Sequence, residues 1–135
     1  MRLPKTIVLV TAASLLLGAC GGGDSDETET NPVVVEGFRV LETIEIHEQD
    51  FSFDPSTIRV ERIAIYGLKI VNDGEVPHSF QIGGPQLQRK IGAIQPGEST
   101  TIAVFLRKRG DYDFFCPLGG HADQGMRGVI TVGPR

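Results

Sequence analysis

The sequence of 135 residues predicts an all-β fold, a Greek-key β-sandwich of about seven to eight strands. Three observations favour this fold class. Short runs rich in β-branched and aromatic residues recur along the chain, turn-forming residues separate them, and no helical periodicity of any length is present. Many short strands at fairly regular spacing are typical of β-sandwiches.

Breaks between the predicted strands contain residues that turn the chain for a steric reason. These breaks are Asp54-Pro55, Asn72-Asp73-Gly74, Gly83-Gly84-Pro85, Gln95-Pro96-Gly97 and Arg109-Gly110. The strands are expected at residues 40–46, 57–61, 63–72, 78–82, 99–106, 110–115 and 129–132. Residues 85–94 fit no strand pattern and are expected to form a loop or a short helical turn.

Side-chain alternation places two chemically active residues on the inner face of the sandwich. Every second side chain of a strand points the same way, so Cys116 continues the inward row of Tyr112 and Phe114. The same parity puts His78 in a row with Phe80. Two neighbouring strands and the loop that follows Cys116 would thus surround a single ion.

The first 19 residues are predicted to be an export signal peptide. Arg2 and Lys5 provide a positive start, residues 7–17 form an apolar run, and small residues follow. The apolar run is too short to span a bilayer, which needs roughly 20 apolar residues. The run from Leu17 to Cys20 is similar to the lipobox of bacterial lipoproteins, which implies lipidation of Cys20.

Lipidation would anchor the exported protein to a bacterial membrane, facing the periplasm or the cell exterior. The alternative is that Cys20 is an incidental cysteine in a signal peptide cleaved elsewhere. Residues 20–36 lack a hydrophobic core pattern and carry most of the acidic excess, so they are expected to form a flexible tether. One folded domain is expected over residues 37–135.

The charge of the folded part bears on one class of partner, the nucleic acids. The formal net charge of −4 comes largely from the tether, and from residue 37 onward the acidic and basic residues nearly balance. This balance gives no electrostatic indication of nucleic-acid binding. The basic cluster at 107–109 is expected to be a solvated hairpin turn, although a cytochrome partner could use it.

One loop carries three groups that bind soft metal ions. Cys116, His121 and Met126 follow one another with four residues in each gap, and His78 lies upstream as a fourth partner. A thiolate, two imidazoles and a weakly held thioether suit a copper ion that alternates between Cu(I) and Cu(II). With Cys20 lipidated, Cys116 also has no partner for an internal disulfide. The sequence therefore predicts a copper site and an electron carrier.

The chain resembles the cupredoxins, the small blue copper proteins that include plastocyanin, azurin and auracyanin. The resemblance covers most of residues 40–132 and depends on the segments 53–60, 72–78, 95–98 and 112–128. It implies that His78, Cys116, His121 and Met126 ligate one copper ion in a type 1 site. In the family the residue after the upstream histidine is often asparagine; here it is Ser79, which can make fewer hydrogen bonds.

The resemblance also implies a function without catalysis. The protein is expected to shuttle single electrons, as a monomer, between redox partners such as a c-type cytochrome, an oxidase or a reductase, with His121 as the exit point. An alternative is periplasmic copper trafficking or buffering, which normally uses Met-rich or His-rich ligation. The chain has only two methionines, which argues against trafficking. Its three histidines are too few to supply a second copper centre of the kind that copper oxidases need. His47 lies outside the expected ligand set and is read as an exposed side chain without a role.

Overall fold

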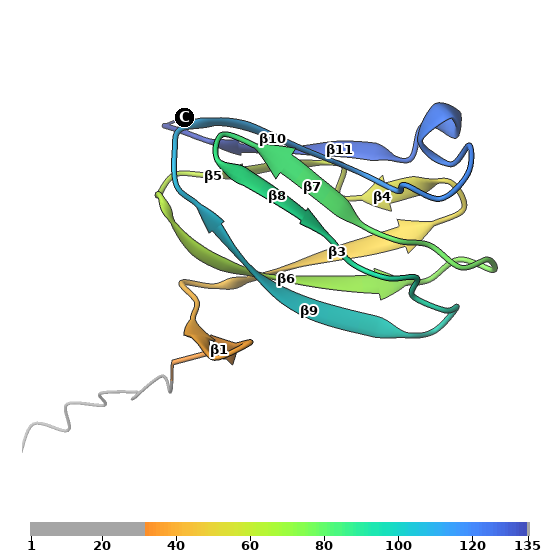
Figure 1. The fold of residues 1–135 in the computed structure, drawn as a ribbon, viewed down its shortest axis with the longest axis horizontal. Helices are drawn as coiled ribbons and strands as arrows, with labels where there is room; N and C mark the ends of the chain where they lie inside the picture. Colours follow the sequence, from red (N-terminus) through yellow and green to blue (C-terminus); the bar gives the residue numbers. More distant parts are fainter. Residues whose placement is uncertain (1–31, 135) are drawn as a thin grey trace, which may run out of the picture. The chain divides into compact units, whose positions relative to one another are not determined.

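The computed structural model describes residues 32–134. The predicted signal peptide, Cys20 and most of the predicted tether lie outside the described residues. In the described part, two β-sheets pack face to face (Figure 1) and enclose one main hydrophobic core. This arrangement confirms the predicted all-β sandwich. Among the described residues, no helix has the length and apolar character needed to cross a bilayer.

The first sheet has four strands in the order β4-β3-β6-β9. β3 and β6 are parallel, and the other neighbours are antiparallel. The strands are β3 (Thr43–Gln49), β4 (Ser52–Asp54), β6 (Ala64–Asn72) and β9 (Ser99–Leu106).

The second sheet has five strands in the order β5-β11-β10-β7-β8. β5 runs parallel to β11, and the remaining pairs are antiparallel. The strands are β5 (Thr57–Val60), β7 (Gln81–Gly84), β8 (Leu87–Lys90), β10 (Gly110–Phe115) and β11 (Arg127–Val132). A 3-10 helix, η1 (Ala122–Gln124), interrupts the loop between β10 and β11.

A small hairpin precedes the two sheets. β1 (Val34–Val35) and β2 (Phe38–Arg39) pair antiparallel, and Val35 lies over β6 close to Gly67. The boundary expected at Gly37 falls inside this hairpin, at its turn. Pro32, at the start of the described chain, lines a surface hollow together with Ala64 at the beginning of β6.

The prediction for residues 85–94 is wrong in part, because β8 lies within them. β7 and β8 form a hairpin in which Gly84 pairs with Leu87, so the turn consists of Pro85 and Gln86. Gly84, predicted to be part of a turn, is the last residue of β7. Glycine fits there because a Cβ atom would lie 2.9 Å from the Asp111 carbonyl oxygen. The mostly polar composition of β8, an edge strand, conceals it from pattern reasoning.

The strand expected at 78–82 begins later than predicted. β7 starts at Gln81, and His78 instead makes an isolated antiparallel bridge with Ile94. The backbone N–H of His78 donates to the Ile94 carbonyl (3.1 Å), and the Ile94 N–H donates to the His78 carbonyl (2.7 Å). The inward orientation predicted for His78 holds, since the residue is fully buried.

Strand directions sort the loops into two ends of the sandwich. The loops 50–51, 73–80, 91–98 and 116–126 share one end, here called the ligand end, on the right of Figure 1. The loops 61–63, 85–86 and 107–109 lie at the opposite end, near the C-terminus. The basic cluster at 107–109 is therefore remote from the expected copper ligands.

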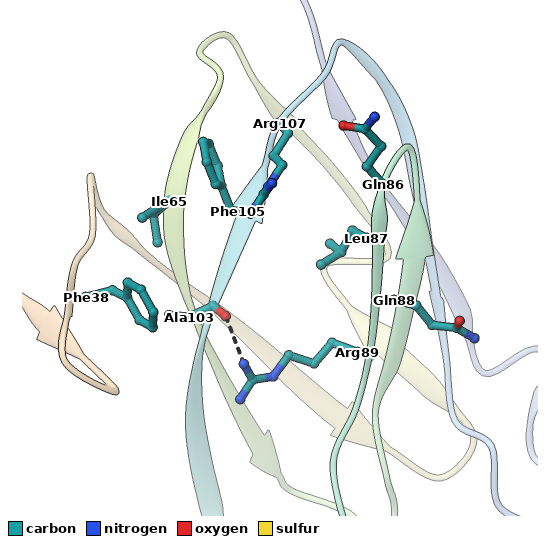
Figure 2. A pocket seen from close by; sticks show the side chains of 9 residues that line it. All are labelled: Phe38, Ile65, Gln86, Leu87, Gln88, Arg89, Ala103, Phe105 and Arg107. Atoms are coloured by element: carbon teal, nitrogen blue, oxygen red, sulfur yellow. Dashed lines mark hydrogen bonds between the residues drawn. The ribbon is translucent and has the colours of Figure 1, made fainter.

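A groove opens between β8 and β9, the edge strands of the two sheets. Figure 2 shows its apolar side chains, among them Phe38, Leu87 and Phe105, and the hydrogen bond that crosses it. In that bond Arg89 donates to the Ala103 carbonyl of β9 at 3.4 Å. The Ala103 N–H donates to Glu36 at 2.8 Å, and Glu36 and Arg89 form an ion pair.

The core of the described part contains one acidic side chain among its apolar residues. Glu48 of β3 is fully buried and faces inward with Ile46, and within the described residues its carboxyl oxygens have no hydrogen-bond partner. Burial raises the pKa of Glu48 to about 7. The remaining buried core side chains come from both sheets and include Phe53, Tyr66, Leu68, Ile70, Phe80, Ile82, Leu106, Tyr112, Phe114, Ile130 and Val132.

This burial makes stability depend on pH. An unfolded glutamate titrates near pH 4.5, so from there to about pH 7 the folded protein keeps a proton that the unfolded chain has released. The free energy of unfolding therefore falls as pH rises through this window, by roughly 3 kcal/mol at most. In Glu48→Gln we expect this fall to disappear, measured by urea unfolding of the metal-free protein at pH 5 and pH 8. The exposed Glu45→Gln is the matched control, and a fall of equal size in both variants would contradict the assignment.

Candidate metal centre

Three side chains converge at the ligand end. The Nδ1 atom of His78 lies 3.3 Å from the Nδ1 atom of His121, and the Cys116 Sγ lies 3.4 Å from the latter. All three atoms fall within 4.8 Å of one another. His78 and Cys116 are fully buried, whereas His121 is half-buried. Both imidazoles thus present the same nitrogen to the thiol sulfur.

The loop that carries two of these groups is fixed by its own backbone. The Cys116 N–H donates to the Met126 carbonyl, and the Met126 N–H donates to the His121 carbonyl, each at 3.2 Å. Gly125, with φ of 107°, ends η1 in the left-handed conformation that glycine adopts without strain. Met126 is fully buried and tied through its backbone to both neighbouring predicted ligands.

A serine hydrogen-bonds to the cysteine sulfur through its backbone. The Ser79 N–H donates to the Cys116 Sγ at 3.4 Å, and the Ser79 hydroxyl donates to the Ile91 carbonyl at 2.8 Å. The single hydroxyl makes one side-chain hydrogen bond, in line with the smaller capacity expected from serine in place of asparagine. The link between the two ligand segments is therefore a main-chain contact that the residue type at 79 does not specify.

Asp50 orients the His78 ring through a hydrogen bond at its Nε2 atom. Its Oδ1 atom lies 2.7 Å from the His78 Nε2, and its Oδ2 accepts the Glu75 N–H at 2.8 Å. The Glu75 N–H, and after it the His78 imidazole, hold the pKa of Asp50 below its ordinary value. A carboxylate at Nε2 keeps the proton on that nitrogen and leaves Nδ1 free to act as a ligand.

Any side chain at position 74 would displace this pair. A Cβ atom on Gly74 would lie 2.2 Å from the Asp50 Oδ1 and 2.9 Å from the His78 Nε2. The Gly74 N–H donates to the Asn72 side chain at 2.8 Å, and the Asn72 amide donates to the carbonyls of Val76 and Ile94. The buried Asn72 thereby holds the loop that leads to His78.

Phe51 packs against the histidine rings. Its ring centroid lies 4.7 Å from that of His121 and 6.1 Å from that of His78. On the core side, Phe53 contacts Phe80 and Phe114 in a cluster of aromatic rings. The candidate ligands thus lie in an apolar shell, which lowers the local dielectric and restricts water.

Sequence reasoning missed Asp50 and Phe51. Asp50 lies 28 residues before His78, and neither residue belongs to a motif with ligand spacing. Their contacts arise only when β3 and the 73–80 loop meet at the ligand end. His47, expected to be an exposed side chain, is partly exposed and paired: its Nδ1 lies 2.5 Å from Asp73 and its Nε2 lies 3.0 Å from Glu45.

The donor set fits a soft, redox-active metal ion. A thiolate and two imidazoles suit copper, and the preset orientation of His78 by Asp50 is typical of metal-ligating histidines. A thioether such as that of Met126 favours copper over zinc, which prefers thiolate, imidazole and carboxylate ligands. Four of the five predicted site residues lie at this end of the sandwich, and the fifth, Cys20, lies outside the described residues.

Known proteins share this domain. A family model described as a cupredoxin-like domain matches residues 26–132. The chain is 30% identical over 97 residues to the copper-resistant cuproprotein CopI of Rubrivivax gelatinosus, covering 59% of each chain. It is 26% identical over 102 residues to the multicopper oxidase mco of Staphylococcus haemolyticus, of which it spans 23%.

Solved structures share the fold, and two of them are auracyanins. Auracyanin B superimposes with a TM-score of 0.64 at 19% sequence identity, covering 76% of this chain and 96% of that one. Dithionite-reduced auracyanin from Roseiflexus castenholzii gives a TM-score of 0.60 at 23% identity, covering 68% and 97%. At these identities the likeness extends to the fold alone.

The role of Asp50 can be measured directly. Asp50→Ala removes the acceptor behind His78 Nε2, and we expect the affinity for Cu(II) to fall about 10- to 100-fold, as is usual for such supporting residues. Competition with a chelator of known affinity measures the change. Asp123→Ala, which removes an exposed carboxylate at the same end, is the control. Equal affinities of the two variants would show that Asp50 does not support the ligand.

Proposed function

The chain belongs to the cupredoxin-like family, and from that premise we propose that it is a type 1 (blue) copper protein that shuttles single electrons between membrane-associated redox partners outside the cytoplasm. The observation that carries this proposal is the convergence of His78 Nδ1, Cys116 Sγ and His121 Nδ1 at one buried point. Export and lipid anchoring through Cys20 are part of the proposal and derive from the sequence.

The proposed ligands are Cys116, His78 and His121, with Met126 as a weak fourth. When bound, copper supplies a one-electron couple between Cu(I) and Cu(II). The side chains around it are held by contacts independent of the ion: Asp50 fixes His78, and the strand backbone fixes Cys116. A pocket fixed in this way favours fast electron transfer, because little has to move when the charge changes.

His121 is the proposed route for electrons. It is half-buried, whereas His78 and Cys116 are fully buried. Phe51 flanks its ring, and the neighbouring loop carries Leu118 and Gly119. A partner that docks over this apolar rim would approach the copper through a single imidazole, and a small, weak interface suits rapid turnover.

The charges at the ligand end favour a basic partner. The loops 50–51, 73–80, 91–98 and 116–126 contain no lysine or arginine, and their acidic residues are Asp50, Asp73, Glu75, Glu98 and Asp123. Arg127, at the start of β11, pairs with Asp123 at 3.6 Å. Opposite charges on the docking face of a cytochrome, oxidase or reductase would steer its approach. The basic cluster at 107–109 lies at the other end and is not available for that contact.

Copper buffering is the second candidate, and the name of the relative CopI is the observation that favours it. The complete burial of His78 and Cys116 argues for a retained ion over an exchangeable one. Catalysis of the oxidase type is not proposed. Of the chain's three histidines, two are assigned to this site and His47 pairs with Asp73 and Glu45.

Copper loading of the full chain separates the carrier from the buffer. We expect an intense thiolate-to-copper absorption band and a reversible one-electron couple, with the band lost in Cys116→Ser. Visible and electron paramagnetic resonance spectra record the first property, and voltammetry records the second. A pale, tightly bound copper without a reversible couple would favour buffering instead.

The docking face can be tested by removing its charge. In the triple variant Glu75→Gln, Glu98→Gln, Asp123→Asn, we expect the bimolecular electron-transfer rate with a basic c-type cytochrome to fall about 10-fold at low salt. Stopped-flow absorbance gives the rate, which in the wild type should decrease as ionic strength rises. The control variant Arg107→Gln, Lys108→Gln alters the opposite end and should keep the wild-type rate. A wild-type rate that increases with salt would contradict the assignment of a basic partner.

A further inference from the structure

Glu48 is the one acidic side chain of the described core, and the metal centre does not explain its placement. It is fully buried, and neither carboxyl oxygen has a hydrogen-bond partner in the described residues. Buried polar groups are normally hydrogen-bonded, and an ionised carboxylate in a dry interior is costly. The site therefore favours the neutral acid unless a positive charge nearby stabilises the anion.

The strand register places Glu48 near the end of β3 that meets the ligand end, two residues before Asp50. It pairs with Asn72 on one side and with Phe53 on the other. Asn72 donates to the carbonyl of Ile94, the residue bridged to His78. Glu48 itself makes no hydrogen bond to any proposed ligand.

The aromatic cluster connects the same layer to the other ligand segment. Phe53 contacts Phe114 at 5.1 Å and Phe80 at 5.9 Å between ring centroids. Phe114 precedes Cys116 by two positions in the chain, and Phe80 follows His78 by two positions. Apolar side chains screen charges poorly. A change of charge at the ligands therefore changes the electrostatic potential at Glu48.

We propose that Glu48 is a proton site linked to the redox state of the centre: it carries a proton when the protein is reduced and releases it when the protein is oxidised. This proposal depends on the proposed copper function. On oxidation one electron passes to the accepting redox partner, the Glu48 O–H bond breaks, and one proton leaves to solvent. Reduction reverses both transfers. The charge added at the ligands is thereby balanced by the carboxylate that forms in the core.

Other titratable groups near Glu48 do not account for such coupling. Its strand neighbours Phe53 and Asn72 do not titrate, and the inward side chains of β5, β7 and β11 are apolar. From β6, β10 and the loops, the titratable groups of the core and the ligand end are Tyr66, Tyr112, Cys116, His78 and His121. Cys116, His78 and His121 are proposed ligands, which a metal keeps free of protons. The hydroxyls of Tyr66 and Tyr112 donate to the carbonyls of Arg62 and Lys108 at the opposite end.

Two acidic or basic side chains on or next to β3 need a control. Asp50 already holds a low pKa through the Glu75 N–H and His78, and it titrates below the relevant range. His47 follows the outward face of β3 and contacts Asp73 and Glu45. His47→Gln changes the neighbouring side chain on the opposite face of the same strand, so it is the matched control.

The test is the midpoint potential of the copper-loaded full chain as a function of pH. Between pH 5 and 9 we expect the wild-type potential to fall as pH rises, with a limiting slope of about 59 mV per pH unit for one proton per electron. Glu48→Gln, which resembles the neutral acid in size, should remove the slope, and His47→Gln should retain it. A slope that survives in Glu48→Gln, or its absence in the wild type, would overturn the proposal.

A second measurement needs no variant and guards against a Glu48→Gln protein that fails to fold. Redox-difference infrared spectra of the wild type should show the carbonyl stretch of a protonated carboxyl in the reduced protein and its loss on oxidation. A difference spectrum without this band would refute the coupling. Failure of the proposed function looks different, because the blue band and the reversible couple would then be missing before any pH dependence is measured.

Discussion

The register between β7 and β10 is the constraint on which the metal centre depends. Phe114 pairs with Ile82 and Phe115 with Gln81, so the chain beyond β10 brings Cys116 beside the Ser79 N–H. On the other flank, the Cys116 N–H continues the ladder to Met126. Because side chains alternate with a period of two, a slip of one residue would turn the sulfur away from the core and disperse the ligands.

Local patterns were sufficient to predict the sandwich and the loop that carries the thiol. The alternation of Tyr112, Phe114 and Cys116 already defines the inner face, and all three are buried. Pattern reasoning failed where a residue acts through a distant part of the chain. No residue near Asp50 in the sequence indicates that its carboxylate pairs with His78. Similarly, nothing near Glu48 indicates that its carboxyl group has no hydrogen-bond partner among the described residues. Likewise β8 is held by its hairpin with β7, and its polar residues alone resemble a loop.

Glu48 illustrates why such exceptions are informative. A core is most stable when local propensity, packing and polar satisfaction agree, and natural proteins depart from that agreement chiefly at functional sites. Here the surrounding core is apolar, yet a carboxyl group without a hydrogen-bond partner among the described residues is retained beside the aromatic cluster. The cost in stability and the sensitivity to charge have the same cause, the low dielectric around the group.

The hydrogen bonds across the groove limit how two copies of this protein can associate through their sheet edges. β9 is an edge strand, and an open edge is a template onto which another chain can add a strand. Midway along β9, both backbone groups of Ala103 are already occupied, by Glu36 from the first hairpin and by Arg89 from the other sheet. An incoming strand would have to displace an ion pair to continue the ladder, so the hairpin protects the domain against edge-to-edge aggregation.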